Sequence, residues 1–80
     1  MFNEIPSKKF LYEATKIFSP NEIVTSDYVA KVCRFDIQTT KNVMKFLELS
    51  GYITNFVHGL GENYPRGFMI TQAGYNWLQN

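Results

Sequence analysis

The segment 37–50, IQTTKNVMKFLELS, most constrains the fold because its apolar residues recur at the period of an α-helix. One side of that helix would gather the residues that face a core. These inward residues are Thr40, Val43, Met44 and Leu47. Asp36 can accept hydrogen bonds from the free N–H groups that begin a helix, and Gly51 suits the left-handed residue that ends one. The sequence therefore predicts an amphipathic helix over 37–50.

Polar side chains occupy the opposite side of this helix. Gln38, Asn42 and Lys45 follow one another at i, i+4 and i+7, and Lys41 flanks them. Gln and Asn can form two hydrogen bonds with the edge of adenine, and Lys suits guanine or phosphate. The helix N-terminus, with its dipole and free N–H groups, would also attract phosphate. The simpler interpretation is a solvated surface, which every amphipathic helix has.

The chain before this segment predicts a helix, a brief strand and a second helix. Ser7 can cap the first helix, whose apolar stripe ends before the turn formers SPN. The stripe consists of Phe10, Leu11, Ala14, Ile17 and Phe18. EIVT (22–25) is short and β-branched, as one brief strand requires. Thr25 or Ser26 then caps a helix over about 26–34. Its inward residues would be Val29, Ala30 and Cys33.

The period changes after Gly51. YITNFVHG and RGFMIT are rich in β-branched and aromatic residues, and they flank the turn formers LGENYP, so a β-hairpin is predicted over about 52–71. Thr71 can cap a last short helix. Its packing residues would be Tyr75, Trp77 and Leu78. The order helix, short strand, helix, helix, hairpin, helix predicts an α+β domain with a three-helix core.

Length and cysteine content restrict how this domain can be stabilised. Its 80 residues allow a single domain. Cys33 is the only cysteine and His58 the only histidine, so neither a disulfide nor a structural zinc site is expected. The chain has no long apolar run, and its first residues, MFNEIPSKKF, lack the apolar centre of a signal peptide. We expect a cytoplasmic protein without cofactors or membrane contacts.

Charge is nearly balanced over the chain but uneven along it. The net charge is +1, whereas a strongly basic domain is the usual signature of nucleic-acid binding. Between residues 31 and 45, however, four basic residues accompany one acid, Asp36. The basic residues are Lys31, Arg34, Lys41 and Lys45. Basic charge is therefore concentrated around the second and third predicted helices, which a tight turn joins.

The segment VAKVCRFDIQTTKNVMKFLELSGYI resembles the helix-turn-helix of winged-helix DNA-binding regulators, such as the MarR-like and PadR-like groups. Ala30 matches the alanine of that pattern, and Cys33 matches its inward hydrophobe. The ending of the pattern falls on Leu47, Glu48, Gly51, Tyr52 and Ile53. ITQAGYNWL is similar to the Thr-x-x-Gly segment that follows the wing, with Thr71 and Gly74 at its fixed positions. The resemblance covers roughly 24–79.

The resemblance implies a single winged-helix domain over 1–80, with the helix-turn-helix at about 26–50 and the wing at about 52–71. It implies that the third helix enters the major groove of double-stranded DNA. The residues that it carries over as DNA contacts are Arg34, Gln38, Thr39, Lys41, Asn42, Lys45, His58 and Arg66. Arg34 would contact phosphate from the turn, and His58 and Arg66 would act from the wing.

The chain departs from the winged-helix pattern at two places. The turn before the third helix often carries glycine in the family, but Arg34 and Phe35 stand here. The wing tip, GLGENYP, holds an acid, Glu62, and has only Arg66 as a nearby cation. Few phosphate contacts imply a modest affinity for each monomer, because Lys and Arg supply most non-specific binding.

Two classes of function follow from the sequence. The first is sequence-specific DNA binding by a small transcriptional regulator. Such a regulator would act as a homodimer whose subunits join near Phe2, Tyr75 and Trp77. The second is a winged helix that binds protein, for example as a subunit of a phage, plasmid or replication assembly. Work as a replication or recombination accessory stays open beside these, and it would still involve DNA. Leu49 lies on the polar side of its helix, where either the hairpin covers it or it marks a protein contact. Catalysis is not expected, because no nucleophile–base set, paired-carboxylate motif or phosphate-binding glycine loop is present.

Overall fold

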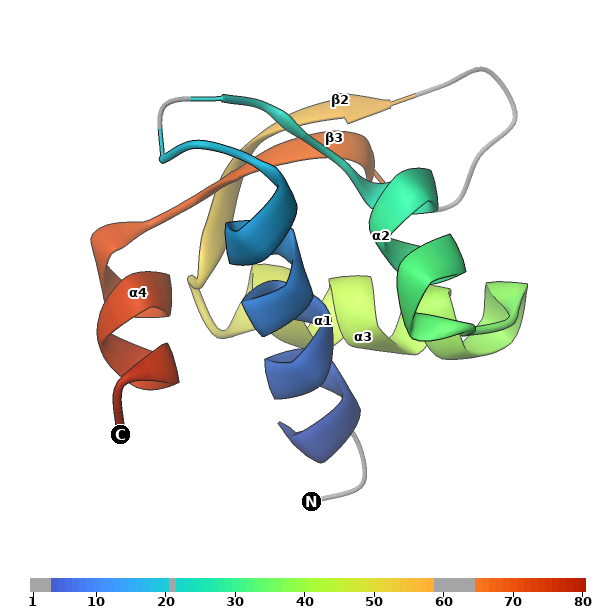
Figure 1. Cartoon of the computed structure of the whole chain (residues 1–80), viewed down its shortest axis with the longest axis horizontal. Helices are drawn as coiled ribbons and strands as arrows, with labels where there is room; N and C mark the ends of the chain where they lie inside the picture. The colour runs from blue at the N-terminus through green and yellow to red at the C-terminus, as the bar shows by residue number, and fades with distance from the viewer. Residues whose placement is uncertain (1–3, 21, 59–64) are drawn as a thin grey trace.

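The computed structural model describes residues 4–20, 22–58 and 65–80, without the side chains of 55–58, 65 and 66 (Figure 1). Its elements are, in order, α1 (Glu4–Ile17), β1 (Val24–Thr25), α2 (Ser26–Cys33), α3 (Ile37–Leu49), β2 (Ile53–His58), β3 (Pro65–Ile70) and α4 (Gln72–Leu78). The described chain thus contains four helices and one three-stranded sheet. This confirms the predicted α+β class and the predicted order of elements.

The sheet is antiparallel and has the strand order β1-β3-β2. β2 and β3 pair as the predicted hairpin, and Val24 of β1 lies opposite Phe68 of β3. In Figure 1 the sheet lies along one border of the molecule, and the helices lie on one side of it. β1 is shorter than the predicted 22–25, because Glu22 and Ile23 are exposed and only Val24 is buried.

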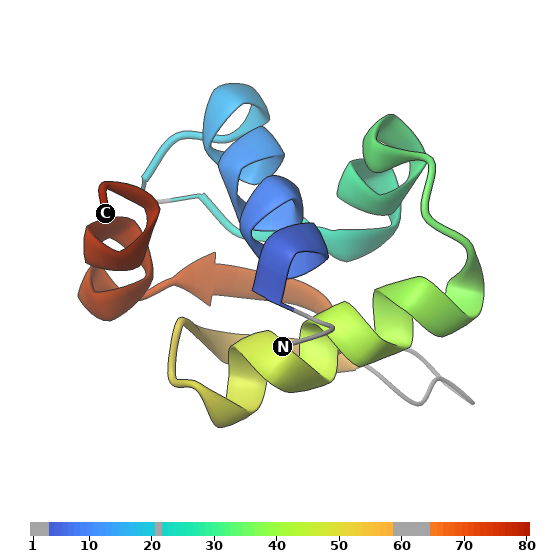
Figure 2. The same cartoon turned by 90° about the horizontal axis from the view of Figure 1, so that it is seen from below.

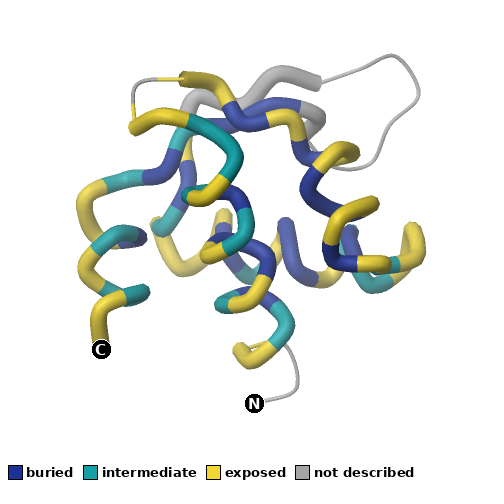
Figure 3. The backbone as a smooth tube through the Cα atoms, viewed as in Figure 1, coloured by how far each residue is buried: buried dark blue, intermediate teal, exposed yellow. Residues whose placement is uncertain are grey.

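The core lies among α1, α2, α3 and the sheet, as the buried segments in Figure 3 show. Its buried hydrophobic residues are Phe10, Leu11, Ala14, Val24, Val29, Ala30, Cys33, Val43, Met44, Leu47, Ile53, Phe68 and Ile70. Thr40 is also buried, and its hydroxyl donates to the Asp36 carbonyl oxygen at 2.8 Å. The inward sides predicted for three helices are confirmed, except that Ile17 and Phe18 are only half-buried.

The first helix begins earlier than the sequence predicts. α1 already includes Glu4, so the expectation that Ser7 caps it is wrong. Ser7 lies at i−3, i−4 and i−7 from Phe10, Leu11 and Ala14, which places it on the buried stripe of the helix. Its hydroxyl oxygen is buried and has no hydrogen-bond partner among the described residues. Ser7 is therefore a small residue of the buried stripe and not the start of the helix.

The predicted ends of α3 are confirmed. The Asp36 carboxylate accepts a hydrogen bond from the Thr39 N–H at 2.7 Å, which caps the N-terminus. At the C-terminus Gly51 has a φ of 78°. The Tyr52 N–H donates to the Leu47 carbonyl at 3.0 Å, as in the Schellman motif. These caps fix both the length of α3 and the direction in which the chain enters the hairpin.

Thr71 connects the end of α3 to the start of α4. Its Oγ1 accepts from the Gly74 N–H at 3.1 Å, which confirms the predicted cap, and donates to the Gly51 carbonyl at 2.7 Å. α4 lies so close to the backbone of Tyr52 that a Cβ on Gly74 would be 2.5 Å from the Tyr52 carbonyl oxygen. Trp77 stacks on Tyr52 with ring centroids 4.5 Å apart. The short last helix is thus held by its cap, a close backbone contact and an aromatic stack.

Two of the three aromatic residues expected at a dimer contact are described by the structure, and both pack against their own chain. Tyr75 and Trp77 are half-buried and pack against the core. Lys8 Nζ lies 5.3 Å from the centroid of the Trp77 ring and donates to the Asn80 carbonyl at 2.7 Å. Phe2 lies outside the described residues. A homodimer that joins at these ends therefore stays a prediction.

Candidate nucleic-acid interface

Four exposed side chains form a line along the outer side of α3. We call Gln38, Asn42, Lys45 and Leu49 the outer ridge; their spacing is i, i+4, i+7 and i+11. In Figure 2, α3 runs along one border of the molecule, and α1 and α2 lie together on one side of it. The outer ridge points away from the buried side of α3, so the exposed polar face predicted for this helix is confirmed.

The first two residues of the outer ridge are joined to each other. Gln38 Nε2 donates a hydrogen bond to Asn42 Oδ1 at 3.1 Å. A pair of this kind at i and i+4 stabilises a helix by about 0.2–0.5 kcal/mol. It also leaves Gln38 Oε1 as an acceptor, and the second Gln38 N–H and the Asn42 NH₂ as donors. The two amides therefore present N–H donors and a carbonyl acceptor side by side.

Two further predicted contacts, Thr39 and Lys41, lie beside the outer ridge and are half-buried. The Thr39 N–H and the Thr40 N–H are already bonded to Asp36, through its carboxylate and its carbonyl oxygen respectively. These two N–H groups are therefore occupied, and attraction of phosphate to the N-terminus of α3 stays a prediction. The hydrogen bonds from Thr39 hold the pKa of Asp36 below its usual value. The N-terminus of α3 thus carries its own carboxylate, which stays ionised at neutral pH.

Arg34 is exposed in the turn between α2 and α3, and its backbone is left-handed, with a φ of 61°. The Phe35 N–H donates to the Ala30 carbonyl at 2.9 Å, and the Arg34 N–H donates to the Lys31 carbonyl at 3.1 Å. This is the same Schellman motif that ends α3 at Gly51. Arg34 therefore occupies the position where glycine is most easily accommodated, and it brings a cation there.

A depression of about 300 Å³ lies beside the outer ridge. The described residues that line it are Asn42, Lys45, Phe46, Leu49 and Ser50, all from α3 or its end. Phe46 and Leu49 make part of this wall apolar, and the other three residues make the rest polar. The C-terminal half of the outer ridge is therefore a mixed surface that can contact both apolar and polar groups.

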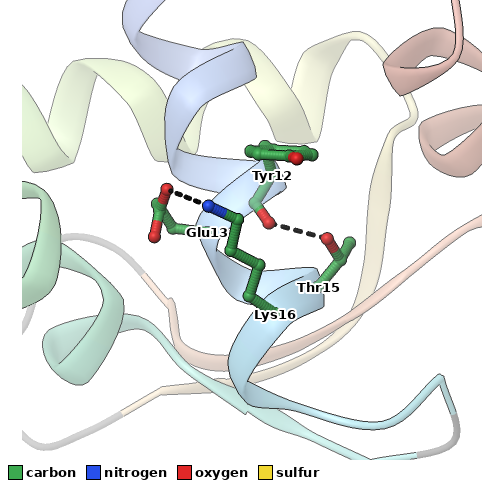
Figure 4. A network of polar contacts seen from close by, with 4 residues as sticks. All are labelled: Tyr12, Glu13, Thr15 and Lys16. Atoms are coloured by element: carbon green, nitrogen blue, oxygen red, sulfur yellow. Dashed lines mark hydrogen bonds and ion pairs between the residues drawn. The ribbon is translucent and has the colours of Figure 1, made fainter.

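One ion pair lies on α1. Lys16 Nζ lies 3.4 Å from Glu13 Oε2 and 4.6 Å from the centroid of the Tyr12 ring, and Thr15 Oγ1 donates to the Tyr12 carbonyl (Figure 4). In contrast, neither Lys41 nor Lys45 forms an ion pair within the described part of the chain. Unpaired positive charge is thus available on α3.

The predicted wing contacts belong to β2 and β3. His58 ends β2 and Arg66 lies in β3, but their side chains are outside the described residues, as is Glu62 at the wing tip. The structure therefore brings together the contacts predicted on α3, with Arg34 in the turn that precedes them. The role of the wing stays a prediction.

Sequence reasoning missed two features of this surface. The Gln38–Asn42 hydrogen bond could have been found, because i and i+4 residues are neighbours on a helix. The left-handed Arg34 could not, because Asn, Asp and Gly are the usual signals for that conformation. Leu49, which the sequence left open, is 77% exposed. No described element covers it.

Within the described ranges, no three His, Cys, Asp or Glu side chains are grouped so that they could hold a metal ion. Cys33 is buried, and burial raises the pKa of its thiol. In the described part of the chain, no helix combines the length and apolar character needed to cross a membrane.

The chain was compared with protein-family models, with curated proteins and with solved structures, and no match was found in any of the three comparisons.

Proposed function

We propose that this domain is a winged helix that binds double-stranded DNA by placing α3 in the major groove. The observation that carries the proposal is the outer ridge, which is exposed along the whole helix and begins with two amides and a cation. Side chains of these types are suited to base edges and phosphates. The order of elements and the β1-β3-β2 sheet are compatible with a winged-helix arrangement.

The charge around the outer ridge supports the same proposal. Arg34, Lys41 and Lys45 have no ion pairs within the described residues, so their charges are available for phosphate. The opposing acid, Asp36, is bonded to the first turn of α3. Three such cations would give a monomer only a moderate affinity, which would fall steeply as salt increases.

Moderate affinity for each monomer favours a symmetric homodimer. Two copies of α3 about one DNA turn apart would read two half-sites and add their contacts. We therefore extend the proposal to a small dimeric transcriptional regulator. A cytoplasmic location is part of it, since the free thiol of Cys33 suits a reducing compartment.

Substitutions on α3 test the proposal. Asn42→Ala should weaken binding to duplexes selected from a random pool by about 1–3 kcal/mol, since it removes one good base contact. Lys45→Ala should weaken binding and reduce the slope of log K against log salt by about 0.9, the value for one phosphate contact. The measurement is fluorescence anisotropy at several salt concentrations, with circular dichroism to show that each variant is folded.

Lys16→Ala is the matched control, because it removes the same charge from α1, where Lys16 is already paired with Glu13. It should leave DNA affinity within about twofold of the wild type, because surface ion pairs contribute little. If Lys16→Ala and Lys45→Ala weaken binding equally, α3 is not the DNA-binding element.

One observation favours a second candidate function. Leu49 is a large apolar side chain that is 77% exposed at the C-terminal end of a polar face, as at a protein-binding surface. A winged-helix module that binds protein, for example in a phage, plasmid or replication assembly, would use Leu49. Failure to bind any duplex at low salt would favour this candidate over DNA binding.

A further inference from the structure

We propose that the outer ridge selects A·T base pairs, with the Gln38–Asn42 pair on the edge of adenine and Leu49 on the methyl group of thymine. The inference rests on the proposed function, because it names the class of DNA that α3 would bind. It is drawn from the hydrogen bond between the two amides and from the position of an exposed leucine on the same line of the helix.

The amide pair distinguishes adenine from guanine. The bond uses one of the two N–H groups of Gln38 Nε2 and one lone pair of Asn42 Oδ1, so the second Gln38 N–H, the Asn42 NH₂ and Gln38 Oε1 stay available. In the major groove adenine presents an acceptor, N7, and a donor, its N6 amino group, whereas guanine presents two acceptors, N7 and O6. Gln38 Oε1 can accept from the adenine amino group but would oppose guanine O6. Gln38 Oε1 with a remaining N–H therefore gives the pair both the acceptor and the donor that adenine requires.

Leu49 has one natural counterpart in the same groove. It lies seven residues beyond Asn42, which is about 10 Å along the helix axis and therefore about three base-pair steps. The C5 methyl of thymine is the apolar group that base pairs expose there. Because Leu49 is 77% exposed, contact with that methyl would remove apolar surface from water on both sides. Its neighbours Phe46 and Ser50 complete the depression in which the methyl would lie.

The charges on α3 are consistent with DNA as the occupant of this surface. Lys45 lies on the outer ridge between Asn42 and Leu49, and the outer ridge itself carries no acid. The one acidic residue within α3, Glu48, is about 100° around the helix from Leu49. An acidic partner such as DNA can therefore approach both the amides and the leucine without facing a carboxylate.

Four synthetic duplexes separate the two contacts. They are alternating dA-dT, alternating dA-dU, alternating dG-dC, and alternating dG-dC in which every cytosine carries a C5 methyl. Replacing thymine with uracil removes only the methyl, so wild-type protein should bind dA-dU about fourfold more weakly for each methyl contacted. Between dA-dT and methylated dG-dC the methyl is present in both, so a preference of at least about fivefold for dA-dT would come from the amide pair.

Three variants assign each preference to its residue. Leu49→Ala should bind dA-dT and dA-dU equally but keep its preference for adenine. Gln38→Ala should lose the preference for dA-dT over methylated dG-dC, because it removes the Oε1 acceptor, but it should still detect the thymine methyl. Ile37→Ala is the matched control, because Ile37 is also an exposed aliphatic residue of α3, 68% exposed, but lies off the outer ridge. It should keep both preferences.

The outcomes separate this inference from the proposed function. Equal wild-type affinity for dA-dT and dA-dU, or a methyl preference that survives Leu49→Ala, would overturn the inference while DNA binding stands. Absence of binding to all four duplexes at low salt would overturn the proposed function itself. The exposed positions of the three substitutions allow each variant to fold, and thermal unfolding checks that it does.

Discussion

Arg34 holds a backbone conformation that glycine adopts at lower cost. Its φ of 61° lies in the left-handed region, where a side chain with a Cβ is disfavoured by about 1–2 kcal/mol. Gly51 occupies the equivalent place after α3, with a φ of 78° and no atom near its missing Cβ. Comparing the two positions can therefore show how much stability the arginine in the turn costs and how much it contributes to DNA binding.

Exchanging the residue types at these positions should separate stability from binding. Arg34→Gly should raise the free energy of unfolding by up to about 1 kcal/mol, because it relieves the left-handed strain. It should nevertheless weaken DNA binding, because a phosphate contact is lost. Gly51→Ala should lower the free energy of unfolding by about 1 kcal/mol, since only its backbone conformation opposes the new Cβ. Urea unfolding and anisotropy measure the two effects. An Arg34→Gly variant that is less stable than wild type would contradict this account.

At the scale of elements, α3 follows almost wholly from local sequence. Its inward period, its Asp36 cap and its Gly51 ending all agree with the structure. α1 follows less well, because Ser7 looks like a cap in the sequence but continues the buried stripe. α4 contains a glycine, which lowers helix propensity, so its stability depends on contacts with distant residues that no local pattern displays.

Because Gly74 lies so close to Tyr52 and Ile70, we expect its replacement by alanine to have the opposite effect from the one that helix propensity predicts. Gly74→Ala should favour an isolated helix by about 1 kcal/mol, yet its Cβ would lie 2.5 Å from the Tyr52 carbonyl oxygen and 2.8 Å from Ile70 Cγ2. We expect a net loss of about 1–3 kcal/mol in the free energy of unfolding, as overpacking usually causes.

Asn76→Ala in the same helix is the control, because Asn76 is exposed. It should change the free energy of unfolding by no more than about 0.5 kcal/mol in a urea titration. If Gly74→Ala were as stable as wild type, α4 would have to sit farther from Tyr52 than this structure has it.

At the scale of the whole molecule, the sequence predicts the order of elements and the buried side of each main helix, because both depend on local periodicity. The pairing of β1 with β3 and the contact of α4 with Tyr52 join residues far apart in the chain, so periodicity does not reveal them. On the candidate site, a helical projection places Gln38, Asn42 and Lys45 outward. It cannot show whether another element covers Leu49, since that depends on tertiary packing.

The most direct test of the central claim is a titration of ¹⁵N-labelled protein with the alternating dA-dT duplex, followed by NMR. If the outer ridge of α3 enters the groove, the side-chain NH₂ signals of Gln38 and Asn42 and the backbone amides of α3 should shift most. Signals from the outer side of α1, around Lys16, should stay in place. Shifts that cluster on α1 or α4, with the Gln38 and Asn42 signals unmoved, would contradict the claim.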